Sequence, residues 1–322
     1  MMVGDVLILT EAGQKIGFGH YSRCSALSKA LLLEGMIVQM MIYLNHADLE
    51  DVNVIETNWL ADIESILTNN KFSTVIVDSY LADINLYIKL QKYFKHVVAI
   101  DDNNRMTYPC QLLINPNVFF SEMNYSNQLA KCFGGKEYVI LRPEFRNQKP
   151  AAINKIRAEE ILITIGGSDF RKILPIVIRS CIETDYLSIN VIDPEGLTRN
   201  IENKYVNILP AQDAKSMVQL MQKADIIISG CGQTLHELAS LGKATIGICI
   251  DVDQEANQEY YLKEGFLQSK IQWNDKDIKD KIKNELEYNK SLDRRNSIVT
   301  FAPSLINKNG ILNIVSIIKN LS

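Results

Sequence analysis

A glycine-rich loop that ends in a histidine is the first feature of the sequence that can do chemistry. Residues 17–23 read Gly-Phe-Gly-His-Tyr-Ser-Arg and follow a short apolar run. Gly17 and Gly19 let the backbone turn tightly and approach a ligand closely. His20 is expected in the first turn of a helix, where the helix dipole lowers the pKa of an imidazole and keeps it available as a neutral general base. Arg23, one turn further on, can bind an anion or fix the loop. The competing interpretation is an ordinary β–α turn with a structural histidine.

A second glycine-rich loop, residues 229–238, reads Ser-Gly-Cys-Gly-Gln-Thr-Leu-His-Glu-Leu and lies between a predicted strand and a predicted helix. Free backbone N–H groups at such a helix start can bind a diphosphate, and a glutamate one turn later can accept both hydroxyls of a ribose. The predicted nucleotide-binding residues here are Ser229, Gly230, Gly232, Gln233, Thr234 and Glu237. Helix capping is the alternative explanation. The loop is not a Walker A sequence, and we interpret His236 as structural.

Two further segments at strand ends are weaker candidates. Gly166 and Gly167, in Gly-Gly-Ser-Asp, are predicted to line the nucleotide site because small residues permit close approach; alternatively the segment is a turn with Asp169 as the helix N-cap. Gln254 and Asn257, in Asp-Gln-Glu-Ala-Asn-Gln, are predicted to bind sugar hydroxyls, although an ordinary helix N-terminus would look much the same.

Polar residues also follow the predicted strands of the first half. Tyr80 and Asn115 can donate hydrogen bonds to a sugar, and Asp78 can orient His20. Asp101 and Asp102 can attract a hard cation. Because neighbouring side chains on an extended segment point in opposite directions, however, we expect one carboxylate to hold a loop or a base and the other to face solvent.

The composition is that of an ordinary globular protein. The 322 residues are 47% hydrophobic and 22% charged, and the net charge of −4 argues against a nucleic-acid partner. The six cysteines are scattered without metal-like spacing, which favours reduced thiols in a cytoplasmic protein and neither a zinc site nor disulfides. No apolar run is long enough for a membrane span, and the N-terminus reads as a buried strand rather than a signal peptide.

Short apolar strands alternate with amphipathic helices, a pattern typical of parallel α/β sheets. The predicted strands are 6–9, 37–44, 74–77, 97–100, 160–165, 187–192, 206–209, 225–229 and 244–250, and the predicted helices are 21–33, 82–94, 170–181, 213–223, 234–241 and 254–264. A polar, proline-containing break near residues 142–159 indicates a linker.

We therefore predict an α/β protein with two doubly wound, Rossmann-like domains. Residues 1–148 would carry the histidine loop, residues 149–302 would bind the nucleotide, and residues 303–322 would form a helix that crosses back to the first domain. Ligands of such sheets bind at the carboxyl ends of the strands, so we expect the site in the cleft where the two domains face each other.

The order of these motifs resembles that of one known family. Gly-Phe-Gly-His-x-x-Arg, Asp-Ser-Tyr, Asp-Asp, Asn-Pro-Asn, Gly-Gly-Ser-Asp and the motif beginning at Ser229 occur as in the UDP-2,4-diacetamido-2,4,6-trideoxy-altropyranose hydrolases of pseudaminic acid synthesis, a group also described as spore-coat polysaccharide biosynthesis proteins. The second-half motif is also similar to that of the UDP-GlcNAc transferase that makes lipid II. The resemblance spans nearly the whole chain.

The resemblance implies a glycosyltransferase-B-like fold whose second domain holds UDP. His20 would then activate a water molecule, which attacks the anomeric carbon and releases UDP with inversion. Tyr80 and Asn115 would contact the sugar, Glu237 would contact the ribose, and neither a metal nor a cofactor is expected. Gln233 within the phosphate loop, and a tail after residue 300 longer than the shortest members need, depart from the family pattern.

The sequence leaves four functions open. The first is the UDP-sugar hydrolase, and the second is an inverting glycosyltransferase that uses the same donor with an unknown acceptor. A non-catalytic nucleotide-sugar-binding protein and an epimerase of the UDP-GlcNAc 2-epimerase kind are the others. The particular sugar and the oligomeric state do not follow from the sequence.

Overall fold

The protein forms two compact units. The computed structural model describes residues 5–13, 17–45, 54–150, 153 and 155–321. The first unit runs to Arg142 and resumes at Asn307, and the second spans Pro143–Ile306. We predicted boundaries after residues 148 and 302. The observed first boundary comes earlier because α4 (Pro143–Arg146) packs against α6 and α7 of the second unit. The second comes later because the 3₁₀ helix η4 (Ala302–Leu305) packs against α7 and α10.

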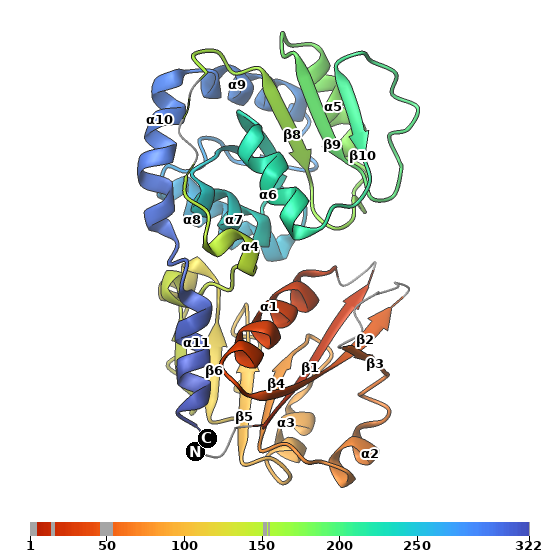
Figure 1. The fold of residues 1–322 in the computed structure, drawn as a ribbon, viewed down its shortest axis with the longest axis vertical. Helices are drawn as coiled ribbons and strands as arrows, with labels where there is room; N and C mark the ends of the chain where they lie inside the picture. The colour runs from red at the N-terminus through yellow and green to blue at the C-terminus, as the bar shows by residue number, and fades with distance from the viewer. Residues whose placement is uncertain (1–4, 14–16, 46–53, 151–152, 154, 322) are drawn as a thin grey trace. The chain divides into compact units, whose positions relative to one another are not determined.

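In the first unit, the described residues form a seven-stranded parallel sheet with the strand order β3-β2-β1-β4-β5-β6-β7 (Figure 1). Its strands are β1 (Asp5–Gly13), β2 (Ile37–Asn45), β3 (Val54–Glu56), β4 (Thr74–Asp78), β5 (His96–Ile100), β6 (Leu112–Asn115) and β7 (Lys131–Gly134). The order reverses between β1 and β4, which is the arrangement of a doubly wound sheet.

Helices cover both faces of this sheet. They are α1 (Gly19–Leu33), α2 (Ile63–Thr68), α3 (Ile84–Leu90) and α11 (Gly310–Lys319), with the 3₁₀ helices η1 (Val118–Glu122) and η2 (Lys136–Tyr138). Since successive strand residues point to opposite faces, Val6 and Ile8 pack with α1 and α11, whereas Leu7 and Leu9 pack with α2 and α3. The C-terminal helix thus completes one core of the first unit.

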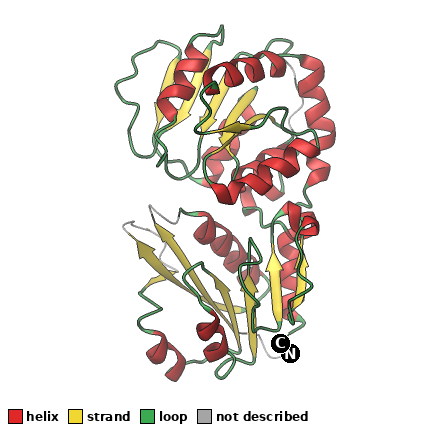
Figure 2. Ribbon diagram, turned by 180° about the vertical axis from the view of Figure 1, so that it is seen from behind, coloured by secondary structure: helices red, strands yellow, loops and turns green. Residues whose placement is uncertain are grey.

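In the second unit, the described residues form a six-stranded parallel sheet with the order β10-β9-β8-β11-β12-β13. Its strands are β8 (Glu160–Thr164), β9 (Ser188–Ile192), β10 (Val206–Leu209), β11 (Ile226–Gly230), β12 (Ala244–Cys249) and β13 (Ile271–Gln272). Its helices are α5 (Leu174–Ile182), α6 (Ala214–Lys223), α7 (Gln233–Leu241), α8 (Glu255–Lys263), α9 (Ile278–Asn289), α10 (Leu292–Phe301) and the 3₁₀ helix η3 (Val252–Gln254). Figure 2 shows helices on both faces of this sheet.

The prediction of two doubly wound parallel sheets is therefore confirmed. The predicted helix over 170–181 begins only at Leu174, because Lys172 has a φ of 57° and the preceding residues form a loop. The predicted helix over 303–321 is shorter, since η4 and a turn precede α11. The predicted linker contains α4. Strands β3, β7 and β13 and helices α2, α9 and α10 were not predicted, and of β6 only the end at Asn115 was. Among the described residues, no helix combines the length and the apolar character needed to cross a bilayer.

Candidate active site

The polar residues predicted in the first half gather at one edge of its sheet. Asp78 is the last residue of β4, Asp102 follows β5, Asn115 ends β6, and α1 begins at Gly19 after β1. Because all these strands are parallel, their carboxyl ends meet at the same edge. The β1–β4 reversal lies there too, which is where doubly wound sheets bind ligands.

Gly17 and Gly19 shape the loop before α1. Gly17 has a φ of 82°, which favours glycine, and its N–H donates to the carbonyl of Gly13 at 2.7 Å. A Cβ atom on Gly19 would meet no atom of the described residues within 4 Å, its chain neighbours aside. The loop is thus open beside the first residue of the helix, as close approach of a ligand requires.

His20 is 6% exposed and is held by a carboxylate. Its Nδ1 lies 2.7 Å from Asp78 Oδ1, so the alternative in which Asp78 orients His20 is the one the structure shows. If Nδ1 donates this hydrogen bond, the lone pair of the neutral ring is on Nε2. The ring also lies edge-on to Tyr80, with 4.6 Å between ring centroids. Such a carboxylate–histidine pair is a common way to hold a general base in one tautomer.

The predicted lowering of the His20 pKa is wrong. Burial and the Arg23 charge do act to lower it, but the charge and hydrogen bond of Asp78, together with the charge of Asp102, raise the pKa above its usual 6.5. The helix N-terminus was the wrong basis for the prediction, because a full charge 2.7 Å away outweighs a partial charge on the backbone.

Arg23 joins two carboxylates in one cluster. Its Nε and Nη2 donate to the two oxygens of Asp78, both at 2.6 Å, and its Nη1 and Nη2 donate to the two oxygens of Asp102 at 2.7 and 2.8 Å. Two bidentate pairs on one guanidinium are geometry that lysine cannot reproduce. Of the two roles predicted for Arg23, the structure therefore shows the fixing role.

The charge balance of this cluster explains why the pKa of His20 is raised. Burial acts to raise the pKa of Asp78 and of Asp102, but Arg23, helped by His20, outweighs it, so the pKa of Asp78 lies well below its usual range and that of Asp102 is lowered. Two carboxylates thus face one guanidinium, and this excess of negative charge favours a proton on His20. The same pair that orients the imidazole therefore makes it a stronger base.

Asp101 and Asp102 have separate partners. Asp101 accepts hydrogen bonds from Tyr108, from Tyr125 and from the backbone N–H of Asn104, so one carboxylate holds a loop, as predicted. The expectation that the other faces solvent is wrong, because Asp102 binds Arg23. Both carboxylates are occupied by protein donors, and the described residues contain no cluster of ligands suited to a metal ion.

Tyr80 and Asn115 differ in exposure. Tyr80 is 39% exposed, and its hydroxyl donates to Asp102 at 3.0 Å. Asn115 is fully buried: its amide donates to the Asp102 carbonyl and to Tyr125, and its oxygen accepts from Asn117. The prediction that Asn115 contacts a sugar has no support in this geometry, because it has no exposed surface and its hydrogen bonds are made within the protein.

In the second unit, Gly232 is the N-cap of α7 and no side chain caps the helix. The Ser229 hydroxyl donates to the Gly230 carbonyl at 3.0 Å, so the capping alternative does not explain this loop. Gly230 has no room for a larger residue, since a Cβ atom there would lie 2.5 Å from the Ile165 carbonyl oxygen. Gln233 and Thr234 open the helix half-exposed.

Two predicted residues near this loop are buried. Glu237 lies one turn into α7 and is 1% exposed. His236 is buried and its Nδ1 lies 2.8 Å from the hydroxyl of Tyr261, which agrees with the structural interpretation.

Gly166 and Gly167 are exposed at the end of β8, and Gly166 has a φ of 128°. The Asp169 carboxylate accepts from the N–H groups of Ile173 and Leu174, both at 2.9 Å, so it caps the start of α5 from four residues before the N-cap position rather than from that position itself.

Gln254 and Asn257 have different surroundings. The Gln254 side-chain oxygen accepts from the N–H groups of Cys231 at 3.0 Å and Ile250 at 3.3 Å, so it ties the glycine loop to the end of β12. Asn257 is 6% exposed, and its side-chain oxygen has no hydrogen-bond partner among the described residues.

Sequence reasoning missed two residues of the first-unit cluster. Asn117 donates to Asp102 Oδ1 at 2.7 Å and is 9% exposed. Glu11, fully buried in β1, accepts from the N–H of Tyr80 at 2.8 Å and from the hydroxyl of Ser79. An acidic residue inside an otherwise apolar strand was the available signal for Glu11, and the Asn-Pro-Asn motif was the signal for Asn117.

No protein-family profile matches the chain. An uncharacterised protein of Methanocaldococcus jannaschii is 25% identical over 281 residues, which is 80% of this chain and 57% of that protein. The chain thus spans little more than half the length of this relative. The spore coat polysaccharide biosynthesis protein SpsG of Bacillus subtilis is 22% identical over 284 residues, covering 80% of this chain and 81% of that protein.

Solved structures share the whole fold. MurG of Acinetobacter baumannii superposes with a TM-score of 0.64 at 14% identity, covering 98% of this chain and 99% of that one. The UDP-GlcNAc 2-epimerase of Neisseria meningitidis, solved with UDP-GlcNAc, gives a TM-score of 0.61 at 14% identity and covers 98% of this chain and all of that one. At these identities the likeness concerns the fold, and it confirms that this chain has two Rossmann-like domains of the glycosyltransferase-B kind.

Proposed function

We propose that this protein is an enzyme that uses a UDP-sugar in polysaccharide biosynthesis and that water is its acceptor. Use of a UDP-sugar is supported by a neighbour of this fold that was solved with UDP-GlcNAc. A role in polysaccharide biosynthesis is supported by the name of the Bacillus subtilis relative. The specific reaction that we propose is hydrolysis of a UDP-2,4-diacetamido-2,4,6-trideoxyhexose. One observation carries it: an oriented histidine, His20, bound to Asp78 at the carboxyl edge of the first sheet.

In the proposed reaction, Nε2 of His20 removes a proton from water while the water oxygen bonds to the anomeric carbon. The bond from that carbon to the β-phosphate oxygen breaks, UDP leaves with the electron pair, and the configuration inverts. Asp78 stabilises the imidazolium that forms, because their hydrogen bond becomes charge-assisted. General-base catalysis of this kind typically contributes about 10²–10⁴-fold in rate.

The second unit would bind the nucleotide. The start of α7 suits a diphosphate, because its N-cap Gly232 has no side chain and a helix N-terminus favours negative charge. Ser229, Gln233 and Thr234 belong to the same loop, and Glu237 is proposed to hold the ribose. Gly166 and Gly167 are proposed to approach the nucleotide from the end of β8, where they are exposed.

Fewer residues than predicted remain proposed contacts of the sugar. Gly17, Gly19 and Tyr80 remain proposed contacts, because their surroundings are open or exposed. Asn257 remains one because its oxygen lacks a hydrogen-bond partner among the described residues. Gln254 is proposed to act mainly by holding the phosphate loop, since its oxygen accepts two backbone N–H groups.

A glycosyltransferase with a sugar hydroxyl as acceptor is the second candidate. Solved glycosyltransferases share this fold, which favours it, and the same His20 would deprotonate that hydroxyl instead of water. Epimerisation of a UDP-sugar is a third candidate, because a UDP-GlcNAc 2-epimerase shares this fold. In that reaction UDP is not released as a net product.

UDP release from UDP-2,4-diacetamido-2,4,6-trideoxyhexoses separates these functions. A hydrolase forms UDP and free sugar in equal amounts without an acceptor, and in ¹⁸O-water the label enters the sugar at the anomeric carbon. A transferase releases UDP at an appreciable rate only after an acceptor is added. Interconversion of sugars with UDP still attached would refute hydrolysis.

A further inference from the structure

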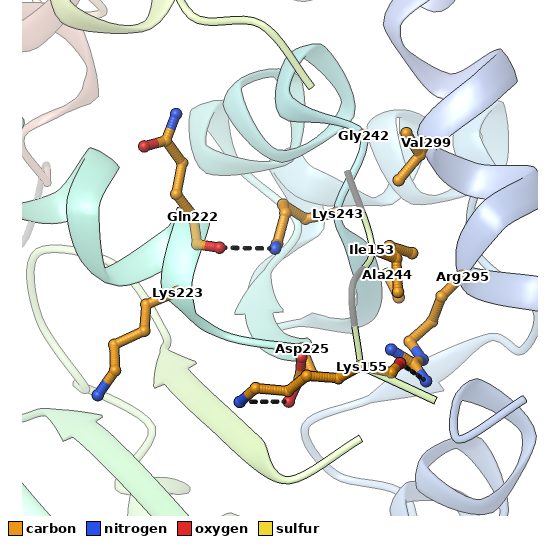
Figure 3. A pocket seen from close by; sticks show the side chains of 10 residues that line it. All are labelled: Ile153, Lys155, Gln222, Lys223, Asp225, Gly242, Lys243, Ala244, Arg295 and Val299. Carbon is orange, nitrogen blue, oxygen red and sulfur yellow. Dashed lines mark hydrogen bonds and ion pairs between the residues drawn. The ribbon is translucent and has the colours of Figure 1, made fainter. Parts of the chain in front are cut away.

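A polar pocket lies in the second unit, at the opposite end of α7 from the glycine loop. It has a volume of about 140 Å³ and is lined by Ile153 and Lys155 before β8, by the end of α6, by the turn between α7 and β12, and by α10 (Figure 3). Its Gly242 ends α7, the same nine-residue helix whose N-terminus is the proposed diphosphate site. At 1.5 Å per residue, about 13 Å of helix separates the two sites.

Arg295 is the first reason to assign a ligand to this pocket. It is 1% exposed, and its Nη2 donates to the carbonyls of Ile156 at 2.7 Å and Lys155 at 3.1 Å. Among the described residues, its buried Nε and Nη1 have no hydrogen-bond partner and no carboxylate forms an ion pair with it. Buried charges are usually paired, so Arg295 gives the wall of the pocket a positive charge that the described residues do not compensate.

Lys243 is the second reason. It is 9% exposed, and its Nζ donates to the Gln222 carbonyl at 3.0 Å (Figure 3). Burial lowers the pKa of this amine to about 8, although Asp225 acts in the opposite direction. No carboxylate of the described residues lies within ion-pair distance of Lys243, so a second buried cation lines the pocket without a counter-ion.

The other charges of the pocket balance one another. Asp225 accepts from the N–H groups of Glu159 and Glu160 at 2.8 and 3.0 Å and lies 3.5 Å from Lys155. Lys223 pairs with Glu160 at 3.2 Å. The excess charge of the pocket therefore resides on Arg295 and Lys243, which together match an anion with two negative charges.

We propose that this pocket binds a phosphate-class oxyanion, either inorganic phosphate or the phosphoryl group of a small molecule. A guanidinium and an ammonium are the side chains that proteins use most for phosphate. The volume is well above the roughly 10–15 Å³ that one water needs. The proposal does not depend on the function of the first-unit cluster.

Isothermal titration of the full chain with inorganic phosphate, at constant ionic strength and with saturating UDP present, tests the proposal. We expect saturable one-site binding that acetate and chloride do not reproduce, together with a phosphate-dependent rise in melting temperature. Phenyl phosphate separates the two sources: tighter binding than phosphate assigns the site to an organic phosphoryl group, and equal or weaker binding assigns it to the free ion.

Lys243→Gln should weaken phosphate binding by roughly tenfold or more, because it removes a buried charged donor. The matched control is Lys223→Gln, whose side chain lines the same pocket but is 66% exposed and paired with Glu160; it should change the affinity by less than about twofold. Arg295→Gln should abolish binding, and if that variant does not fold, Lys243→Gln still decides. Absence of saturable binding, or wild-type affinity in Lys243→Gln, would overturn the proposal.

Discussion

His20 Nδ1 and Asp78 Oδ1 lie 2.7 Å apart although 58 residues separate them in the chain. The histidine comes from the first turn of α1 and the aspartate from the end of β4, which are brought together by the parallel pairing of β1 and β4. The pair fixes the imidazole and raises its pKa, which affects both the rate of the proposed reaction and the stability of the fold.

Replacing the proposed base should lower turnover without much change in substrate affinity. We expect His20→Gln to reduce kcat by about 10²–10⁴-fold, while the KM stays close to wild type, in a continuous assay of UDP release. The matched control is His96→Gln, at the opposite end of the same sheet where β5 begins, which should keep wild-type kcat. Full turnover in His20→Gln would rule out the general-base role.

The pH dependence of the rate should show the raised pKa of His20. A base must be deprotonated, so kcat/KM should fall on acidification through an apparent pKa above 6.5. Asp78→Asn removes the largest influence that raises this pKa and should move the acidic limb to lower pH, with a lower maximal rate. If the acidic limb of the kcat/KM profile lies at the same pH in this variant as in the wild type, a group other than His20 titrates.

Stability should change in the opposite sense over the same pH range. Because the folded pKa of His20 is raised, its protonation stabilises the fold fully below pH 6.5, and this contribution is lost as the pH rises through the folded value. The lowered pKa of Asp78 gives a separate contribution that is present above 3.8 and lost in acid. Urea unfolding between pH 3 and 9 follows both, and His20→Gln should remove the change at higher pH and weaken the one in acid, because the charge and hydrogen bond of His20 also help to lower the pKa of Asp78.

Arg23 should matter greatly for stability. Arg23→Met leaves the buried carboxylate of Asp78 and the partly buried one of Asp102 without their cation, and breaking a buried pair typically costs about 3–5 kcal/mol. The control Lys319→Met removes only an exposed ion pair with Glu34 at 2.8 Å and should leave the urea midpoint unchanged. An equally small effect of both substitutions would contradict the buried cluster.

Two glycines of the phosphate loop should respond differently to alanine. In Gly230→Ala the new Cβ would lie 2.5 Å from the Ile165 backbone oxygen, so we expect a loss of about 1–3 kcal/mol in the free energy of unfolding. In Gly232→Ala the nearest atom is 3.5 Å away, on the flexible side chain of Gln254. This variant should keep its stability and lose UDP affinity if the diphosphate approaches the backbone there, as calorimetry with UDP can measure.

Chelation should not affect the reaction. Asp78, Asp101 and Asp102 are occupied by protein hydrogen-bond donors, which leaves these carboxylates committed to Arg23, to tyrosines and to backbone. We therefore expect UDP release to continue at the same rate after dialysis against EDTA. Loss of the activity, with recovery on addition of Mg²⁺, would show that one of these carboxylates exchanges its partners for a metal.

The sequence alone determined most of the strands, the glycine loops and the fold class. Apolar runs such as Thr74–Val77 and Ala244–Ile250 predicted buried parallel strands, because such strands are covered on both faces. Glycines at strand–helix junctions, as at Gly17 and Gly232, indicated where the backbone could approach a ligand. These signals are local, since each depends on residues adjacent in the chain.

Only the tertiary structure decided which charged side chains meet. The sign of the His20 pKa shift depends on Asp78, the partner of Asp102 is Arg23, and Asn115 is buried because the loop carrying Tyr125 packs over it. The unpaired cations Arg295 and Lys243 line one pocket although they belong to separate helices and turns. Electrostatic interactions depend on distance in space, and strand order, which no local pattern of residues encodes, sets those distances.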